Sequence, residues 1–293
     1  MYRVIALDLD GTILNSDKKV SEISKKVLQH LTSKTFKNAN GQDVMVLLAS
    51  GRAPYLVQPV EEEIEIDCNL IGYNGGLCLS TKSEGRSTLF SRSIEYPHMQ
   101  QIFKYVDENN HFLNVYGESH VYGTSKAELR AKPDIYAKMT GATYKFFDHP
   151  YSELSESVAP TKSLIIFEDE QECDSMLEQL KPQFPEVSLV KSNCMTKEHK
   201  QFYVEFLQKG VNKGSAIRDF CKAKNISIDQ VIAFGDAEND IEMLTEAGHG
   251  ICLANGADQT KQAANYVSEF TNDQDGVARE LIKVFNLPAE LFQ

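Results

Sequence analysis

The 293-residue sequence lacks several features that would place it in a specialised class of protein. No apolar run approaches the length needed to cross a bilayer, which argues against a membrane protein. Basic side chains number 30 against 42 acidic ones, giving a formal net charge of −12. This balance argues against nucleic acid as a partner, because nucleic acid is bound through positive surfaces. Hydrophobic residues at 42% and charged residues at 25% are typical of an ordinary globular protein, and no internal repeat or low-complexity tract is present.

Cysteine is present but shows no functional spacing. The six cysteines are scattered, without a CxxC pair or a metal-ligand pattern. Several lie in apolar stretches, so we expect buried free thiols in a reducing cytosol. The chain enters an apolar segment within its first residues, so no signal peptide is expected. The sequence therefore predicts a cytoplasmic protein that has no membrane partner.

Two carboxylates follow the first apolar segment. Residues 3–14 read RVIALDLDGTIL, and the run from Val4 to Leu7 is typical of a strand buried in a parallel sheet. Ligands bind beyond the carboxyl ends of such strands, where Asp8 and Asp10 lie. A divalent cation with oxygen ligands, above all Mg²⁺, would relieve the repulsion between the two carboxylates. A simple turn at the strand end is the alternative, since Asp and Gly are common in turns.

A second acidic loop lies near the other end of the chain. Residues 231–244 read VIAFGDAENDIEML, in which Asp236 follows an apolar strand and Asn239 and Asp240 begin a helix. Acidic side chains are stabilised at helix N-termini, so this loop alone would not indicate a site. In a parallel sheet, however, both acidic loops would reach the same edge. Together the two loops favour a metal site.

Two further segments supply groups that could hold a phosphate. Residues 44–52 read VMVLLASGR, so Ser50, Gly51 and Arg52 follow another apolar strand. A hydroxyl and a glycine N–H can both donate to a phosphate oxygen. Lys213 lies at a predicted helix start, where the ammonium and the helix dipole would attract an anion. Each segment has an ordinary alternative, since most lone lysines are solvated and a strand-to-helix turn would explain the SGR sequence.

The order of these four segments resembles the haloacid dehalogenase superfamily of aspartate-nucleophile phosphatases. The resemblance is closest to its Cof-like members, whose usual sequence motifs are similar to YNGG at 73–76, GDAEND at 235–240 and TNDQDGVA at 271–278. It extends from Arg3 to about Phe285. It implies an α/β fold, with a Rossmann-like parallel-sheet core and an inserted α+β cap domain of the large C2 type.

The resemblance also implies roles for the motif residues. Asp8 would be the nucleophile that forms an aspartyl-phosphate, since a carboxylate is ionised at neutral pH without a base. Asp10 would be the acid and base, with a pKa raised by burial and by its neighbour. Ser50 and Lys213 would stabilise the phosphoryl oxygens and so count as catalytic. The residues that would bind the phosphate are Ser50, Gly51, Lys213 and Asn239.

The same resemblance implies the metal ligands. Mg²⁺ would bind to Asp8, to the main-chain carbonyl of Asp10 and to Asp236. Asn239 and Asp240 would orient water or the lysine from outside this ligand set. Two weaker candidates for the site are Arg52 and Asn74.

The middle of the chain differs from its two ends. Strand and helix patterns alternate at the beginning and end, whereas the middle is rich in strands, which predicts an antiparallel α+β insertion. The core is expected to comprise 1–78 and 208–293, and the cap 79–207. Glycines near both crossings, at 74–76 and 208–210, are predicted hinges, with rigid turns as the alternative.

These observations predict a Mg²⁺-dependent phosphomonoester hydrolase that acts on a small soluble phosphometabolite. A phosphosugar, a phosphorylated polyol or a cofactor phosphate would fit, with specificity set by the cap. A sugar phosphomutase on the same scaffold is the alternative that the motifs do not separate. A non-catalytic metabolite-binding protein is a further alternative, although Asp8 and Asp10 are both present.

Overall fold

The computed structural model describes residues 1–117, 120–158, 160–195 and 198–292. The chain forms two compact units, residues 1–90 with 212–293, and residues 91–211. Within the described ranges, no helix is long and apolar enough to cross a membrane.

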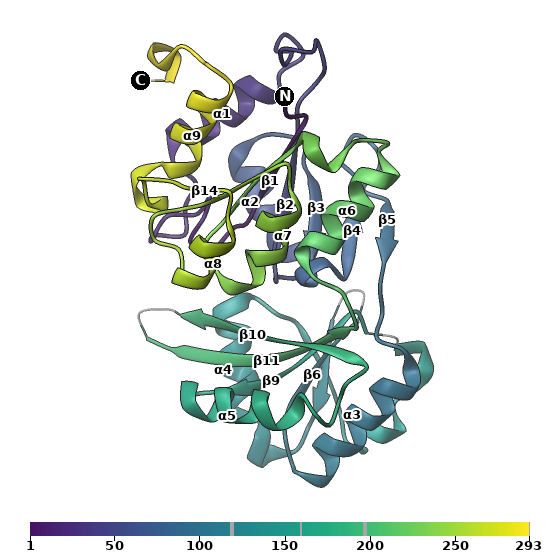
Figure 1. Ribbon diagram of the computed structural model, residues 1–293. Coiled ribbons are helices and arrows are strands. Elements are labelled where there is room, and N and C mark those ends of the chain that lie inside the picture. The colour runs from purple at the N-terminus through teal and green to yellow at the C-terminus, as the bar shows by residue number, and fades with distance from the viewer. Residues whose placement is uncertain (118–119, 159, 196–197, 293) are drawn as a thin grey trace. The chain divides into compact units, whose positions relative to one another are not determined.

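An eight-stranded sheet is the centre of the first unit (Figure 1), with strand order β14-β13-β12-β1-β2-β3-β4-β5. Its strands are β1 (Val4–Leu7), β2 (Met45–Ala49), β3 (Asn69–Gly72), β4 (Leu77–Leu79), β5 (Thr88–Ser91), β12 (Val231–Gly235), β13 (His249–Cys252) and β14 (Tyr266–Val267). The strands from β14 to β3 pair in parallel, and β4 is antiparallel to β3. All four residues of β1 are fully buried, as its continuous apolar run predicts.

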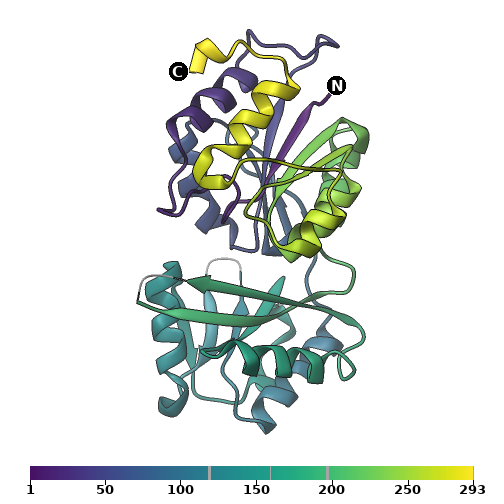
Figure 2. The ribbon, with the colours of Figure 1, turned by 60° about the vertical axis from the view of Figure 1, so that its left-hand side comes forward.

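Helices cover both faces of this sheet. They are α1 (Glu22–Thr32), α2 (Pro54–Ile64), α6 (Lys213–Ala223), α7 (Ile241–Glu246), α8 (Asp258–Ala263) and α9 (Gly276–Val284). Helices α1, α2 and α9 pack on the face that includes Ile5 and Leu7, whereas α6 and α7 pack on the face of Val4 and Ala6. Figures 1 and 2 both show α1 and α9 side by side on one face. The result is a three-layer α/β unit of the Rossmann-like kind.

The order of the strands fixes where a ligand can bind. From β1 the chain first continues through β2 and β3 on one side, and it later returns through β12, β13 and β14 on the other side. The topology therefore switches between β1 and β12. In open parallel sheets, ligands bind outside the carboxyl ends of the strands at such a switch point.

The second unit has its own sheet and core. Its six strands have the order β10-β11-β9-β6-β7-β8, and helices α3 and α5 contribute to a common apolar core on one face. The strands are β6 (Leu113–Tyr116), β7 (Val121–Thr124), β8 (Tyr144–Phe147), β9 (Lys162–Phe167), β10 (Val187–Met195) and β11 (Lys200–Gln208), and the helices are α3 (Tyr96–Glu108), α4 (Ala131–Thr140) and α5 (Glu170–Leu180). Most pairs are antiparallel as expected, but β7 and β8 are parallel.

The predicted domain boundary at residues 78 and 79 is wrong. Strands β4 and β5 continue the sheet of the first unit, so residues 79–90 belong to that unit and the division falls after residue 90. The segment 74–76, predicted as a hinge, therefore lies inside the first unit. The second boundary falls at residues 211 and 212 rather than 207 and 208.

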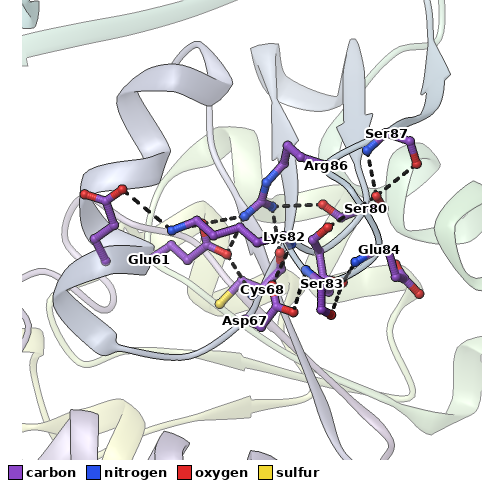
Figure 3. Close-up of polar contacts among 11 residues, drawn as sticks. Glu61, Asp67, Cys68, Ser80, Lys82, Ser83, Glu84, Arg86 and Ser87 are labelled. Carbon is purple, nitrogen blue, oxygen red and sulfur yellow. Dashed lines mark hydrogen bonds and ion pairs between the residues drawn. The ribbon is translucent and has the colours of Figure 1, made fainter.

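A buried ion pair joins the β4–β5 connection to α2. Glu61 of α2 is 0% exposed, and its two carboxylate oxygens accept hydrogen bonds of 2.6 Å each from Arg86. The same carboxylate accepts from the Cys68 N–H at 2.9 Å and lies 3.3 Å from the Lys82 ammonium. Arg86 also donates to the carbonyl oxygens of Cys68 and Ser80, both at 2.9 Å. Figure 3 shows Glu61 and Arg86 pointing toward each other, so the connection is tied to the first unit.

We expect Glu61→Gln to lower the free energy of unfolding by about 2–3 kcal/mol, because it leaves the Arg86 guanidinium without its charged partner. Gln keeps the shape and one acceptor oxygen, so the loss of stability measures the contribution of the carboxylate charge. Glu62→Gln on the same helix is the matched control, since the Glu62 side chain is 67% exposed. Urea unfolding of both variants measures the difference, and equal stabilities would contradict the role given to this pair.

Candidate active site

Four loops at the carboxyl edge of the first sheet carry the motif residues. Asp8 follows β1, Ser50 follows β2 and Asp236 follows β12, while Lys213 is the first residue of α6. The N-terminus of α6 is fixed by Asn212, whose side chain accepts from the Ser215 N–H at 2.7 Å. The two acidic loops therefore meet at one edge of the sheet, as predicted, because β1 and β12 are parallel neighbours.

Lys213 connects two of the acidic residues. Its ammonium donates to Asp8 Oδ1 and to Asp240 Oδ1, each at 2.6 Å. The Lys213 and Asp240 side chains are 0% exposed, and that of Asp8 is 9% exposed. A lysine is rarely buried so completely unless it is paired. Lys213 is therefore held as a charged group beside the predicted nucleophile.

Asp236, in the second acidic loop, makes hydrogen bonds both to the first acidic loop and within its own loop. The hydroxyl of Thr12 donates to Asp236 Oδ1 at 2.7 Å, and the Asp236 N–H donates to Asp240 Oδ2 at 3.0 Å. Gly11 has φ +85°, and a Cβ at this position would lie 2.4 Å from Asp236 Oδ2. Glycine is thus required for the close approach of the two loops.

Crowding of these carboxylates changes their acidity. Burial, followed by the charge of Asp240, raises the pKa of Asp8 above its usual range, against the opposing effect of Lys213. Burial and Asp240 likewise raise the pKa of Asp236 to about 6. Burial lowers the pKa of Lys213, but the carboxylates of Asp240 and Asp8 outweigh it and the net pKa is raised. One ammonium therefore compensates the three carboxylates incompletely.

This excess of negative charge fits a hard divalent cation. Asp8, Asp236 and Asp240 each offer a carboxylate oxygen, and these atoms all lie within 4.8 Å of one another. Oxygen ligands of this kind suit Mg²⁺ and Ca²⁺, and a cation would offset the rise in carboxylate pKa. The predicted ligands Asp8 and Asp236 belong to this cluster. Asp240, predicted to act from outside, belongs to it as well, although both of its oxygens already accept hydrogen bonds.

The pKa predicted for Asp10 is wrong in direction. Its carboxylate accepts hydrogen bonds from Arg52 Nε at 2.8 Å and Arg52 Nη2 at 2.6 Å, and from Lys18 Nζ at 2.8 Å. Burial raises the pKa of Asp10, but Arg52 and Lys18 outweigh it and the net pKa lies below the usual value. The cause is the two cations, whose approach the local sequence does not reveal.

The Ser50 loop is connected to the rest of the site through Asn74. The Asn74 N–H donates to the Ser50 carbonyl at 3.0 Å, and Asn74 Oδ1 accepts from Asn239 Nδ2 at 2.9 Å. A Cβ at Gly51 would lie 3.1 Å from the same Asn74 oxygen. Asn74 has φ +52°, a left-handed conformation that Asn tolerates. The weaker candidate Asn74 thus lies between the Ser50 loop and the second acidic loop, and the other, Arg52, binds Asp10.

Two residues of the site escaped the sequence reasoning. Thr12 follows the carboxylate pair and Gly11 in the chain, and its hydroxyl binds Asp236, which lies far away in the sequence. Lys18 was not singled out, and it reaches Asp10 from a position with φ +58°. The position of Thr12 in the sequence DLDGT, residues 8–12, is the local signal that could have found it. Nothing local indicated Lys18.

Comparison with known proteins identifies the family. A family model of haloacid dehalogenase-like hydrolases matches residues 5–281. The chain is 30% identical to a putative phosphatase of Haemophilus influenzae over 285 residues, which covers 97% of this chain and 99% of that protein. A crystal structure from Thermotoga maritima has 27% identity and a TM-score of 0.78, with 97% of both chains covered. The chain therefore belongs to the haloacid dehalogenase-like hydrolases. The family is one of hydrolases and the relative from Haemophilus influenzae is named as a phosphatase, so the protein is a phosphatase.

A further relative has a named substrate. The chain is 26% identical to a 5-amino-6-(5-phospho-D-ribitylamino)uracil phosphatase of Bacillus subtilis over 289 residues, covering 97% of this chain and 98% of that protein. That substrate carries its phosphate on a ribityl chain.

We expect Mg²⁺ to bind more weakly at pH 5 than at pH 7.5, because protons compete for ligand carboxylates. Asp236 has a pKa of about 6, so binding should weaken about tenfold for each pH unit below that value if one proton is displaced. Isothermal titration of the protein with MgCl₂ measures the affinity. Asp236→Asn should bind weakly and lose this part of the pH dependence. Equal affinities of the unaltered protein at both pH values would contradict the assignment.

Proposed function

We propose that the protein is a Mg²⁺-dependent phosphomonoester hydrolase that works through an aspartyl-phosphate on Asp8. The observation that carries the proposal is the buried Lys213 ammonium, which contacts Asp8 and Asp240 at 2.6 Å. A buried cation beside a carboxylate nucleophile can compensate the charge of an incoming phosphoryl group. The same cation favours the anionic form of Asp8, against the burial and the Asp240 charge that raise its pKa.

Two residues of this chain, Asp8 and Asp10, would carry out both steps of hydrolysis. A carboxylate oxygen of Asp8 forms a bond to phosphorus as the bond from phosphorus to the leaving oxygen breaks, and Asp10 gives that oxygen a proton. Asp10 then takes a proton from the water that attacks phosphorus, which releases phosphate and restores Asp8. Since Arg52 and Lys18 hold Asp10 ionised in this structure, their contacts must loosen and Asp10 must take up a proton from solvent before it donates.

Asp8, Asp236 and the main-chain carbonyl of Asp10 would hold the Mg²⁺. Bound there, the cation supplies charge neutralisation for the carboxylates and the phosphoryl oxygens. Asp240 would position Lys213 and, through the Asp236 N–H, the second acidic loop. Ser50, Gly51 and Asn239 would bind phosphate oxygens, with Asn74 joining their loops.

For the substrate we propose a small phosphorylated polyol or sugar, including one joined to a heterocycle. The support is the relative from Bacillus subtilis, whose named substrate is a phosphoribityl compound. We assign to the second unit the role of a cap that selects the leaving group and excludes water.

The cysteine pattern, which has no CxxC pair, fits a reducing cytoplasm.

The test is a panel of phosphate monoesters assayed for phosphate release with Mg²⁺ and with EDTA. We expect Mg²⁺-dependent release from one or more polyol or sugar phosphates. Transfer of the phosphoryl group to a second sugar, only in the presence of a bisphosphate activator, would support the phosphomutase instead. Binding without turnover would support the metabolite-binding alternative, and either result would overturn the hydrolase.

A further inference from the structure

The TNDQDGVA segment, residues 271–278, has no part in the chemistry proposed above. It forms a 3₁₀ turn, Asn272–Gln274, directly before α9. The Thr271 N–H donates to Gln274 Oε1 at 3.1 Å, and Asp275 ends the turn with φ +61°. This local structure fixes the turn and leaves the side chains of Asn272 and Asp273 for contacts elsewhere.

Both of these side chains bind the turn that follows the Asp8 and Asp10 pair. Asn272 Nδ2 donates to the Leu14 carbonyl at 2.9 Å. Asp273 accepts from the Ser16 N–H at 2.7 Å and from the Ser16 hydroxyl at 2.6 Å. These hydrogen bonds join positions more than 250 residues apart in the sequence.

A third side chain extends the connection toward Asp10. Asn255 Nδ2 donates to the Gly11 carbonyl at 2.8 Å, and Asn255 Oδ1 accepts from the Asn272 N–H at 3.0 Å. The Gly11 carbonyl is in the residue next to Asp10, and Leu14 forms a β-bridge with Asp10. The three side chains therefore bind the turn at Gly11, Leu14 and Ser16. Two of these residues adjoin Asp10, Gly11 in the chain and Leu14 through the bridge.

We propose that Asn255, Asn272 and Asp273 form a brace that positions Asp10 for proton transfer to the leaving group. This inference rests on the proposed function, which makes Asp10 the acid. The brace holds the backbone of residues 11–16 from outside while Arg52 and Lys18 hold the Asp10 carboxylate. When the carboxylate leaves these cations, the braced backbone keeps it within reach of the leaving oxygen.

A positioning role differs from a merely stabilising one in its dependence on the leaving group. An alkoxide needs a proton as it departs, whereas p-nitrophenolate is stable without one, so loss of a general acid affects the alkyl ester more. A brace that positions the acid should show the same selectivity. A general weakening of the fold would slow both esters alike.

The experiment compares Asn272→Ala and Asp273→Ala with the unaltered protein on p-nitrophenyl phosphate and on the best alkyl phosphate of the panel. We expect kcat/KM on the alkyl phosphate, which reports the steps up to departure of the leaving group, to fall about tenfold, and kcat/KM on p-nitrophenyl phosphate to change less than about twofold. Asp17→Ala is the matched control, because it removes a charge from the same loop and its carboxylate makes no hydrogen bond or ion pair with any residue that the structure describes. The control should leave both rates unchanged.

Hydrogen exchange supplies a readout that is independent of turnover. In the metal-free protein, Asn272→Ala should speed the exchange of amides in a peptide covering residues 11–16 several-fold, with α2 unchanged. Unchanged exchange, or equal loss of kcat/KM on both esters, would overturn the brace. An unaltered protein that hydrolyses no ester would instead overturn the proposed function and, with it, the role of Asp10. The two failures are therefore distinct.

Discussion

Asp8→Asn is expected to abolish phosphate release while leaving the protein folded. The substitution keeps the shape of the side chain but replaces the attacking carboxylate oxygen by a neutral amide, which cannot form the acyl phosphate. Because a covalent mechanism fails as a unit, kcat should fall by at least about 10³-fold, or ~4 kcal/mol in activation free energy. Phosphate release from p-nitrophenyl phosphate measures the loss, since that ester needs little help from the acid.

The structure indicates that this variant will remain folded. The amide oxygen of the substituted side chain can still accept from Lys213, which donates to the Asp8 carboxylate at 2.6 Å in the unaltered protein. Removing one of three crowded carboxylates also removes a charge whose burial, followed by repulsion from Asp240, raises the pKa of Asp8. We therefore expect a melting temperature equal to or above that of the unaltered protein. Retention of more than about a tenth of the activity would contradict the aspartyl-phosphate mechanism.

The elements that could be predicted are those whose signal is local. A run of apolar residues bounded by polar ones specified β1, whose four residues are all buried. The connection from β4 to β5 could not be assigned in this way. Its place in the first sheet depends on Arg86 pairing with Glu61, a partner 25 positions away in the sequence.

The same distinction holds within the site. Asp8, Asp236 and Lys213 were found because each follows a strand or begins a helix, so topology alone brings their loops to one edge. The acidity of Asp10 could not be predicted, because it depends on the orientation of two long cationic side chains. Asp240 was interpreted as lying outside the ligand set, and its carboxylate lies in the buried cluster. The position of a residue after a strand therefore predicts which loop it lies in, whereas its acidity and its partners depend on side-chain contacts that the sequence does not show.

Lys213→Met is expected to lower the free energy of unfolding by about 3–5 kcal/mol at pH 7.5, because it leaves Asp8 and Asp240 buried without a counter-charge. Met has a similar length and can fill the space of the lysine stem. Activity should be lost as well, since the phosphoryl group would then meet uncompensated negative charge. Lys222→Met, an exposed position on the same helix, is the matched control and should behave as the unaltered protein.

The pH dependence of this variant tests the electrostatic cause. A carboxyl group whose folded pKa lies above the unfolded value of 3.8 binds more protons when folded, so its contribution to stability increases as pH falls through the folded pKa. Asp8 already has a raised pKa, and loss of the ammonium should raise it further. Urea unfolding at pH 7.5 and pH 5.5 should therefore show Lys213→Met recovering more stability on acidification than the unaltered protein does. A variant that is equally destabilised at both pH values would indicate lost packing, and the assignment of Lys213 as the buried counter-charge would be wrong.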